Sequence, residues 1–90
     1  MITKELELKN KLGLHLRAAS KLSDVASSFE SFILLSNDNG QKIDAKSVLG
    51  ITLLAAAYGS KIVVSAEGSD EKEAMISIEE LFDKKFGEEV

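Results

Sequence analysis

The sequence predicts an α+β protein, an open-faced two-layer β-sandwich in which a four-stranded antiparallel sheet carries three helices on one face. Strand-like alternation and helix-like spacing of apolar residues succeed each other along the chain in the order β-α-β-β-α-β-α. Only one loop between consecutive predicted strands is short enough for a tight β-hairpin. The two β-α-β crossovers must be right-handed, which favours a split arrangement with all helices on the same side of the sheet.

Composition is typical of one small globular domain, expected to span residues 1–90. The chain contains 44% hydrophobic and 29% charged residues, and it has no cysteine, which excludes disulfides and thiolate metal sites. Its formal net charge of −4 argues against general nucleic-acid binding. Early charges exclude a signal peptide and no apolar run reaches the length of a membrane span. We therefore expect a cytoplasmic monomer that binds neither nucleic acid nor membrane.

A loop separates the first strand from the first helix. Apolar and polar residues alternate from Ile2 to Lys9, which predicts a half-buried strand, and Asn10–Leu14 forms the loop. From Leu16 to about Ser28 apolar residues recur every three or four positions, which predicts an amphipathic helix with one face in the core. Those apolar residues are Ala19, Leu22, Val25, Ala26 and Phe29.

The middle of the chain predicts a β-hairpin and a short helix. The apolar run Phe32–Leu35 ends at Asn37–Gly40, where Asn-Gly is a strong hairpin signal because both residues tolerate positive φ. Gln41–Ala45 is the returning strand. Ser47 then caps a short helix that extends to Ala55, since its hydroxyl can accept a hydrogen bond from a free N–H of the first turn.

The last third predicts one strand and one helix. Gly59 closes the preceding segment, and Lys61–Glu67 is the fourth strand. Ser69 or Asp70 caps the last helix, with Glu73 placed as in a capping box. The apolar face of this helix comprises Ala74, Ile78, Leu81 and Phe82, with Met75 and Phe86 beside it.

His15 is the only histidine, and it lies where the first loop gives way to the helix. The first N–H groups of a helix lack partners, and the helix dipole places about half a positive charge there. A phosphoryl group on the imidazole would lie in that field, and the Arg17 guanidinium could pair with the phosphoryl oxygens. Lys9, Lys11 and Lys21 add positive charge around the histidine.

Other interpretations of His15 stay open. A histidine at a helix start can simply fill space there. A catalytic triad is disfavoured because no partner acid lies nearby in the sequence. A metal site is disfavoured because one histidine without neighbouring carboxylates offers too few ligands. We therefore expect neither a metal nor a cofactor.

Three segments together resemble the HPr family, the small histidine phosphocarriers of the bacterial phosphoenolpyruvate-dependent phosphotransferase system. These segments are Gly13–Ala19, Lys46–Gly50 and Gly68–Glu71, and the order of elements matches over the whole chain. The resemblance implies that His15 accepts a phosphoryl group from enzyme I, on Nδ1, and passes it to an acceptor protein of the EIIA type. The acceptor would serve sugar transport or a nitrogen-related regulatory branch, and the chain would be a carrier rather than an enzyme.

The resemblance also implies roles for residues near the histidine. Arg17 would balance the charge of the phosphoryl group. Ser47 corresponds to a serine that HPr kinase/phosphorylase modifies in some bacteria, although its role as a helix cap is sufficient to explain it. Docking of partner proteins is implied for Val48 and Leu49, with partial core burial as the alternative. Leu16 and Ser20 are also expected to take part in docking.

Three positions depart from the family pattern. Leu16 and Ala18 stand where the family often has alanine and proline, and Leu12 occupies a position that is often small and polar. Because Ala18 is a good helix former, the fold should persist without the proline. Leu16 is expected to cover the site or to add an apolar contact with a partner. The segment Asn10–Gly13 is similar to the nitrogen-related branch.

Two competing functions come from other classes. The first is a small-molecule-binding regulatory β-α-β-β-α-β domain without phosphotransfer, which would need paired domains and a ligand cleft. The second is a regulatory relative that acts only through Ser47, which would have no use for His15 at the helix start.

Overall fold

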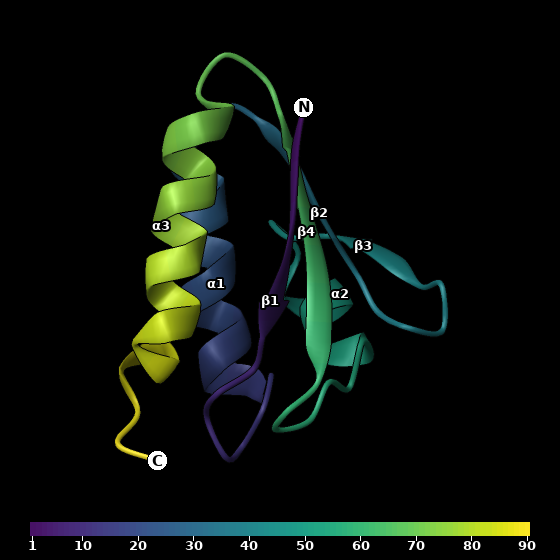
Figure 1. Cartoon of the computed structure of the whole chain (residues 1–90), viewed down its shortest axis with the longest axis vertical. Coiled ribbons are helices and arrows are strands. Elements are labelled where there is room, and N and C mark those ends of the chain that lie inside the picture. The colour runs from purple at the N-terminus through teal and green to yellow at the C-terminus, as the bar shows by residue number, and fades with distance from the viewer.

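The computed structural model describes residues 1–90 and confirms the predicted fold class (Figure 1). The elements are β1 (Ile2–Glu7), α1 (Leu16–Ser27), β2 (Phe32–Ser36), β3 (Lys42–Asp44), α2 (Val48–Leu53), β4 (Lys61–Glu67), α3 (Glu71–Asp83) and the closing 3-10 turn η1 (Lys85–Gly87). Helices α1 and α3 lie side by side against the sheet, and α2 packs against α1 and β3 (Figure 1). None of the helices is both long and apolar enough to cross a membrane.

The sheet has the strand order β1-β4-β2-β3, and every neighbouring pair is antiparallel. The last strand is therefore inserted between the first two, with Ile2 opposite Ala66 and Ile33 opposite the same residue on the other side. This arrangement is the split topology expected when both crossovers are right-handed. In β4 the alternate residues Ile62, Val64 and Ala66 are fully buried, because only one face of the sheet is covered.

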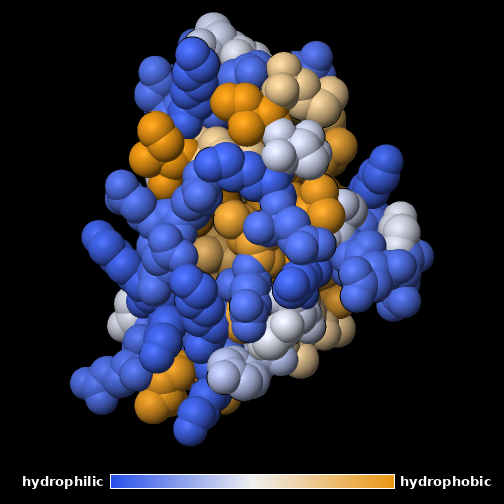
Figure 2. Space-filling model, in the orientation of Figure 1, coloured by the Kyte–Doolittle hydropathy of each residue, from blue (hydrophilic) through white to orange (hydrophobic).

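One continuous core of 19 buried apolar residues lies between the helices and the sheet. Helix α1 contributes Ala19, Leu22 and Ala26 as predicted, whereas Val25 and Phe29 lie at its margin. Polar side chains cover most of the face on which α3 lies, interrupted by separate apolar patches (Figure 2). The core residues of α3 and the following turn are Ala74, Met75, Ile78, Phe82 and Phe86.

The predicted hairpin is present, but its turn differs from the prediction. Within this turn only Gly40 has a positive φ, at 80°, so Asn39 and Gly40 do not form the expected two-residue turn. Instead the Asn37 carboxamide oxygen accepts hydrogen bonds from the backbone N–H groups of Asn39 and Gln41. The loop is longer than predicted, and β3 spans Lys42–Asp44 rather than Gln41–Ala45.

Two other elements end earlier than predicted. Strand β1 ends at Glu7 rather than Lys9, although Leu8 still donates a backbone hydrogen bond to Ser60. Helix α2 ends at Leu53 rather than Ala55, because Ala55 adopts a φ of 50° that no right-handed helix contains.

The predicted capping box of α3 is wrong. Asp70 occupies the N-cap position, but its carboxylate accepts hydrogen bonds from the backbone N–H groups of Glu30 and Ser31 and from the Ser31 hydroxyl. The bond from that hydroxyl, together with the backbone bonds, lowers the pKa of Asp70. The Glu71 carboxylate, not that of Glu73, accepts a bond from the nearby backbone N–H of Gly68, at 3.1 Å. The Asp70 carboxylate therefore binds the loop before β2 and does not cap α3, as the local sequence pattern had predicted it would.

Candidate functional site

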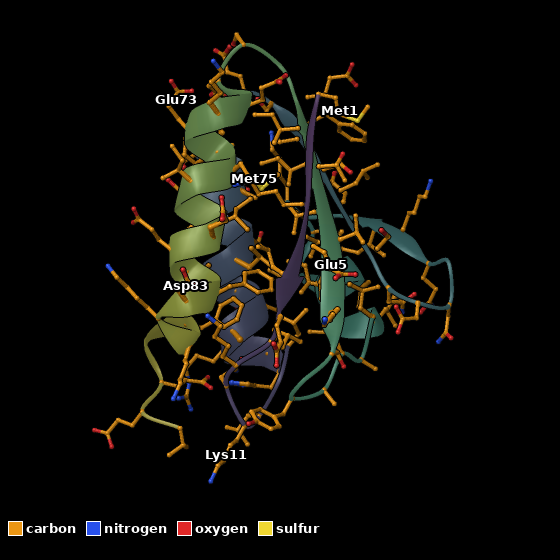
Figure 3. All side chains as sticks on the ribbon, in the orientation of Figure 1. Met1, Glu5, Lys11, Glu73, Met75 and Asp83 are labelled. Atoms are coloured by element: carbon orange, nitrogen blue, oxygen red, sulfur yellow. The ribbon has the colours of Figure 1, made fainter.

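His15 is the N-cap residue of α1, with φ −73° and ψ 176°. Its carbonyl oxygen accepts the first helical hydrogen bond, from Ala19 N–H at 2.8 Å, while its side chain makes no capping bond. The imidazole is therefore free of the helix backbone, and 26% of the side chain is exposed. Lys11 marks the end of the molecule where α1 begins, opposite to Met1 and Glu73 (Figure 3).

The start of α1 has the features of an anion site. The backbone N–H groups of Leu16, Arg17 and Ala18 have no hydrogen-bond acceptor within the chain, and no acidic residue lies in the first turn. Unpaired N–H groups and the positive end of the helix dipole both favour an anion at this position. Arg17 is exposed and its guanidinium makes no hydrogen bond, so its donors remain available.

Glu88 lies against the imidazole, a contact that the sequence interpretation missed. Its Oε2 contacts Nε2 of His15, and its Oε1 accepts a hydrogen bond of 2.9 Å from Nδ2 of Asn10. Only 8% of the Glu88 side chain is exposed. Burial raises the pKa of this carboxyl, but the hydrogen bonds from Asn10 and His15 and the charges of His15 and Arg17 outweigh it, so that the pKa is lowered.

The chain after α3 brings Glu88 to the histidine. Lys85 and Phe86 both adopt left-handed backbone conformations, with φ of 56° and 57°. The Phe86 ring is buried against Phe82, at 5.1 Å between ring centroids, and its carbonyl accepts a bond of 2.7 Å from Lys21 Nζ. The chain therefore continues past the end of α3 as a packed segment and reaches the end of the molecule where α1 begins, which is where the C-terminus lies (Figure 1).

Gly13 fixes the loop that carries His15. It adopts a φ of 67°, and a Cβ atom built on it would lie 2.4 Å from the carbonyl oxygen of Ala56. That same oxygen accepts a hydrogen bond of 3.0 Å from Leu14 N–H. The loop before α1 is thereby closed onto the segment after α2, so two separate parts of the chain set the position of the histidine.

The predicted docking residues lie around the two helices. Leu16 and Leu49 are among the most exposed apolar side chains, at 67% and 71%, whereas Ser20 and Val48 are half-buried. The Ser47 hydroxyl accepts a hydrogen bond of 3.0 Å from Gly50 N–H, which confirms its predicted role as a helix cap. The start of α2 is tied to α1 by a bond of 2.8 Å from the Ser23 hydroxyl to the Lys46 carbonyl.

The site is an open surface. Neither His15 nor Arg17 lines any of the four surface hollows of the molecule. No group of three or more histidine, cysteine or acidic side chains is placed to hold a metal ion. The arrangement offers a partly exposed imidazole beside unpaired donors, with no enclosure for a small substrate.

Known proteins resemble the chain over nearly its full length. The family model described as "PTS HPr component phosphorylation site" matches residues 2–84. The phosphocarrier protein HPr of Cupriavidus necator is 42% identical over 88 residues, which cover 98% of each chain. The phosphocarrier protein NPr of Escherichia coli K12 is 38% identical over 88 residues, with the same coverage. The crystal structure of HPr-C-His from Thermoanaerobacter tengcongensis has a TM-score of 0.94 and 43% identity, and 100% of both chains is covered.

Proposed function

The chain belongs to the HPr family of phosphotransferase-system phosphocarriers, and from that premise we propose that it carries a phosphoryl group on His15. The group would come from enzyme I and pass to an acceptor protein of the EIIA type, in the cytoplasm. One observation carries this proposal: the single histidine lies, partly exposed, beside three unpaired backbone N–H groups at the start of α1. The chain thus supplies a nucleophile and an anion site, while enzyme I supplies the phosphoenolpyruvate chemistry.

The small-molecule-binding alternative is less well supported. A ligand domain needs a cleft with convergent polar groups, whereas His15 lies outside every hollow of the surface. A relative that acts only through Ser47 gives no reason for the unpaired N–H groups around the histidine.

The test is phosphorylation with phosphoenolpyruvate and a general enzyme I, followed by intact mass before and after acid treatment. We expect one phosphoryl group, lost in acid, because the P–N bond of a phosphohistidine hydrolyses in acid while a phosphoserine ester persists. An unlabelled protein, or a label that withstands acid, would contradict the proposal.

Arg17 is proposed to stabilise the phosphoryl group without accepting it. The guanidinium donates paired hydrogen bonds to phosphate oxygens, which a lysine ammonium cannot reproduce. We expect Arg17→Lys to slow transfer by roughly tenfold and Arg17→Ala by more, since a charge-assisted hydrogen bond contributes about 1.5–3 kcal/mol. Both proteins should melt like wild type, because the side chain is exposed and makes no hydrogen bond. Stopped-flow measurement of the rate of phosphoryl transfer from enzyme I tests this prediction. Unchanged rates in both variants would remove Arg17 from the mechanism.

Ser47, Val48 and Leu49 are proposed to form a second part of the docking surface, which HPr kinase/phosphorylase can modify at Ser47. A phosphate there adds about −1.5 to −2 charge beside an apolar contact. We expect Ser47→Asp and Val48→Glu each to slow transfer from enzyme I by about tenfold or more, because the new charge must be desolvated or repelled on docking. Aspartate is itself a good N-cap, so Ser47→Asp should change unfolding free energy by less than about 1 kcal/mol.

Ser69→Asp is the matched control for this surface. It adds the same charge at the exposed start of α3, at the opposite end of the molecule from His15 (Figure 1). Its transfer rate should equal that of wild type. Full-speed transfer in both α2 variants would place this helix outside the interface, and a large fall in their melting temperature would favour the purely structural roles.

A further inference from the structure

The contact between Glu88 and His15 determines which nitrogen of the imidazole is free. An ionised carboxylate can only accept hydrogen bonds, and the pKa of Glu88 is lowered, so the carboxyl is charged at neutral pH. Nε2 of His15, which touches Oε2, must then carry a hydrogen. A neutral imidazole has one N–H, so Nδ1 is left with a bare lone pair.

We propose that Glu88 is the positioning residue of phosphoryl transfer at His15. Its carboxylate holds the hydrogen on Nε2 through the whole cycle and keeps Nδ1 as the nucleophile. This inference rests on the proposed function, and it adds a residue from the C-terminal segment to a site otherwise built from the start of α1.

Asn10 holds the carboxylate in one orientation. The Asn10 side chain is fully buried, and its Nδ2 donates to both Glu88 Oε1, at 2.9 Å, and the Gly13 carbonyl, at 2.8 Å. Both amide hydrogens are thereby used, so Asn10 cannot turn over to offer its oxygen to residue 88. Glu89, by contrast, is exposed and makes no hydrogen bond.

The chemistry needs no proton to leave the site. When enzyme I donates, the P–N bond on its phosphohistidine breaks and the Nδ1 lone pair of His15 forms a new P–N bond. The ring, with Nε2–H retained, then carries a positive charge that the Glu88 carboxylate balances. On transfer to the acceptor, the P–Nδ1 bond breaks, its electron pair returns to Nδ1, and neutral imidazole is released. Without the hydrogen on Nε2 the leaving group would be an imidazolate anion, which is far less stable.

Glu88→Gln gives the decisive test because it preserves shape but reverses the hydrogen bond. Asn10 requires an oxygen from residue 88, so the glutamine must present its NH₂ group to Nε2 of His15. An amide donor there favours the tautomer with the hydrogen on Nδ1, which removes the nucleophile. Wrong-tautomer substitutions of this kind are severe in enzymes that orient a histidine with a carboxylate.

We expect Glu88→Ala to transfer about tenfold more slowly than wild type, which corresponds to roughly 1.4 kcal/mol of barrier. We expect Glu88→Gln to transfer about a hundredfold more slowly than wild type, which corresponds to roughly 2.7 kcal/mol. The ¹⁵N shifts of His15 in the unphosphorylated protein should show hydrogen on Nε2 in wild type and on Nδ1 in Glu88→Gln. Glu89→Gln, the matched control, should equal wild type in both measurements. A merely structural role predicts the opposite order, with the isosteric glutamine close to wild type and alanine impaired.

The outcomes separate this inference from the carrier role. If wild type is labelled normally while Glu88→Gln transfers at the wild-type rate or keeps hydrogen on Nε2, the positioning role of Glu88 is overturned and the carrier role stands. If enzyme I does not label wild type at all, the carrier role fails and the transfer role of Glu88 fails with it. Melting curves on both variants verify that the rates come from folded protein.

Discussion

The His15→Ala protein is expected to take up no acid-labile phosphoryl group from phosphoenolpyruvate and enzyme I. The loss should be complete, because the chain has no second histidine and no cysteine to substitute as a nitrogen or sulfur nucleophile. The fold should persist, since the His15 side chain makes no capping bond and its carbonyl, which accepts from Ala19, is retained. Intact mass before and after acid treatment measures the label, and circular dichroism verifies the fold.

Asp24→Ala is the control for this result. Asp24 is exposed on α1, beyond the first turn of the helix, and its loss should leave labelling unchanged. An acid-labile label that persists in His15→Ala would show that another residue is the acceptor. A label that persists and withstands acid would instead favour a protein that acts through Ser47.

The fold was predictable because its signals are local and its topology is constrained. Periodicity distinguishes helix from strand over a few residues, and crossover handedness leaves few ways to arrange the elements. The capping box of α3, by contrast, failed at a place where two segments meet. Asp70 was assigned to a helix cap, but the loop before β2 offers its carboxylate three donors instead. No pattern within the last helix contains that information.

Only the part of the candidate site that is built from residues adjacent in sequence could be predicted. His15, Arg17 and the start of α1 are adjacent in sequence, so spacing alone brings them together. Glu88 is 73 residues from His15, so no local sequence pattern connects the two. Glu88 reaches His15 because Lys85 and Phe86 adopt left-handed backbone conformations, which local sequence rules expect of glycine. The available signal was the apolar Phe86 just beyond the helix, which indicates that the chain stays packed there.

Gly13→Ala is expected to have the largest effect on stability among the substitutions considered, a loss of about 3 kcal/mol of unfolding free energy. Left-handed backbone costs a non-glycine residue about 1 kcal/mol or more. The added methyl would also lie 2.4 Å from the Ala56 carbonyl oxygen, a backbone atom that cannot rotate aside. Overpacking of this kind costs about 1–3 kcal/mol. For a domain of this size the melting temperature should fall by about 12–24 °C.

Gly40→Ala isolates the contribution of the clash. Gly40 also has positive φ, at 80°, but a Cβ atom there would meet nothing within 4 Å. Its loss should be about 1 kcal/mol, from backbone conformation alone. Denaturant unfolding of both proteins measures the difference, and equal losses would mean that the loop before α1 can move away from Ala56. In that case the close approach would not fix His15, and the folded fraction of Gly13→Ala would transfer at the wild-type rate. If the approach does fix His15, transfer by that fraction should be slowed, because relieving the clash moves the loop that carries the histidine.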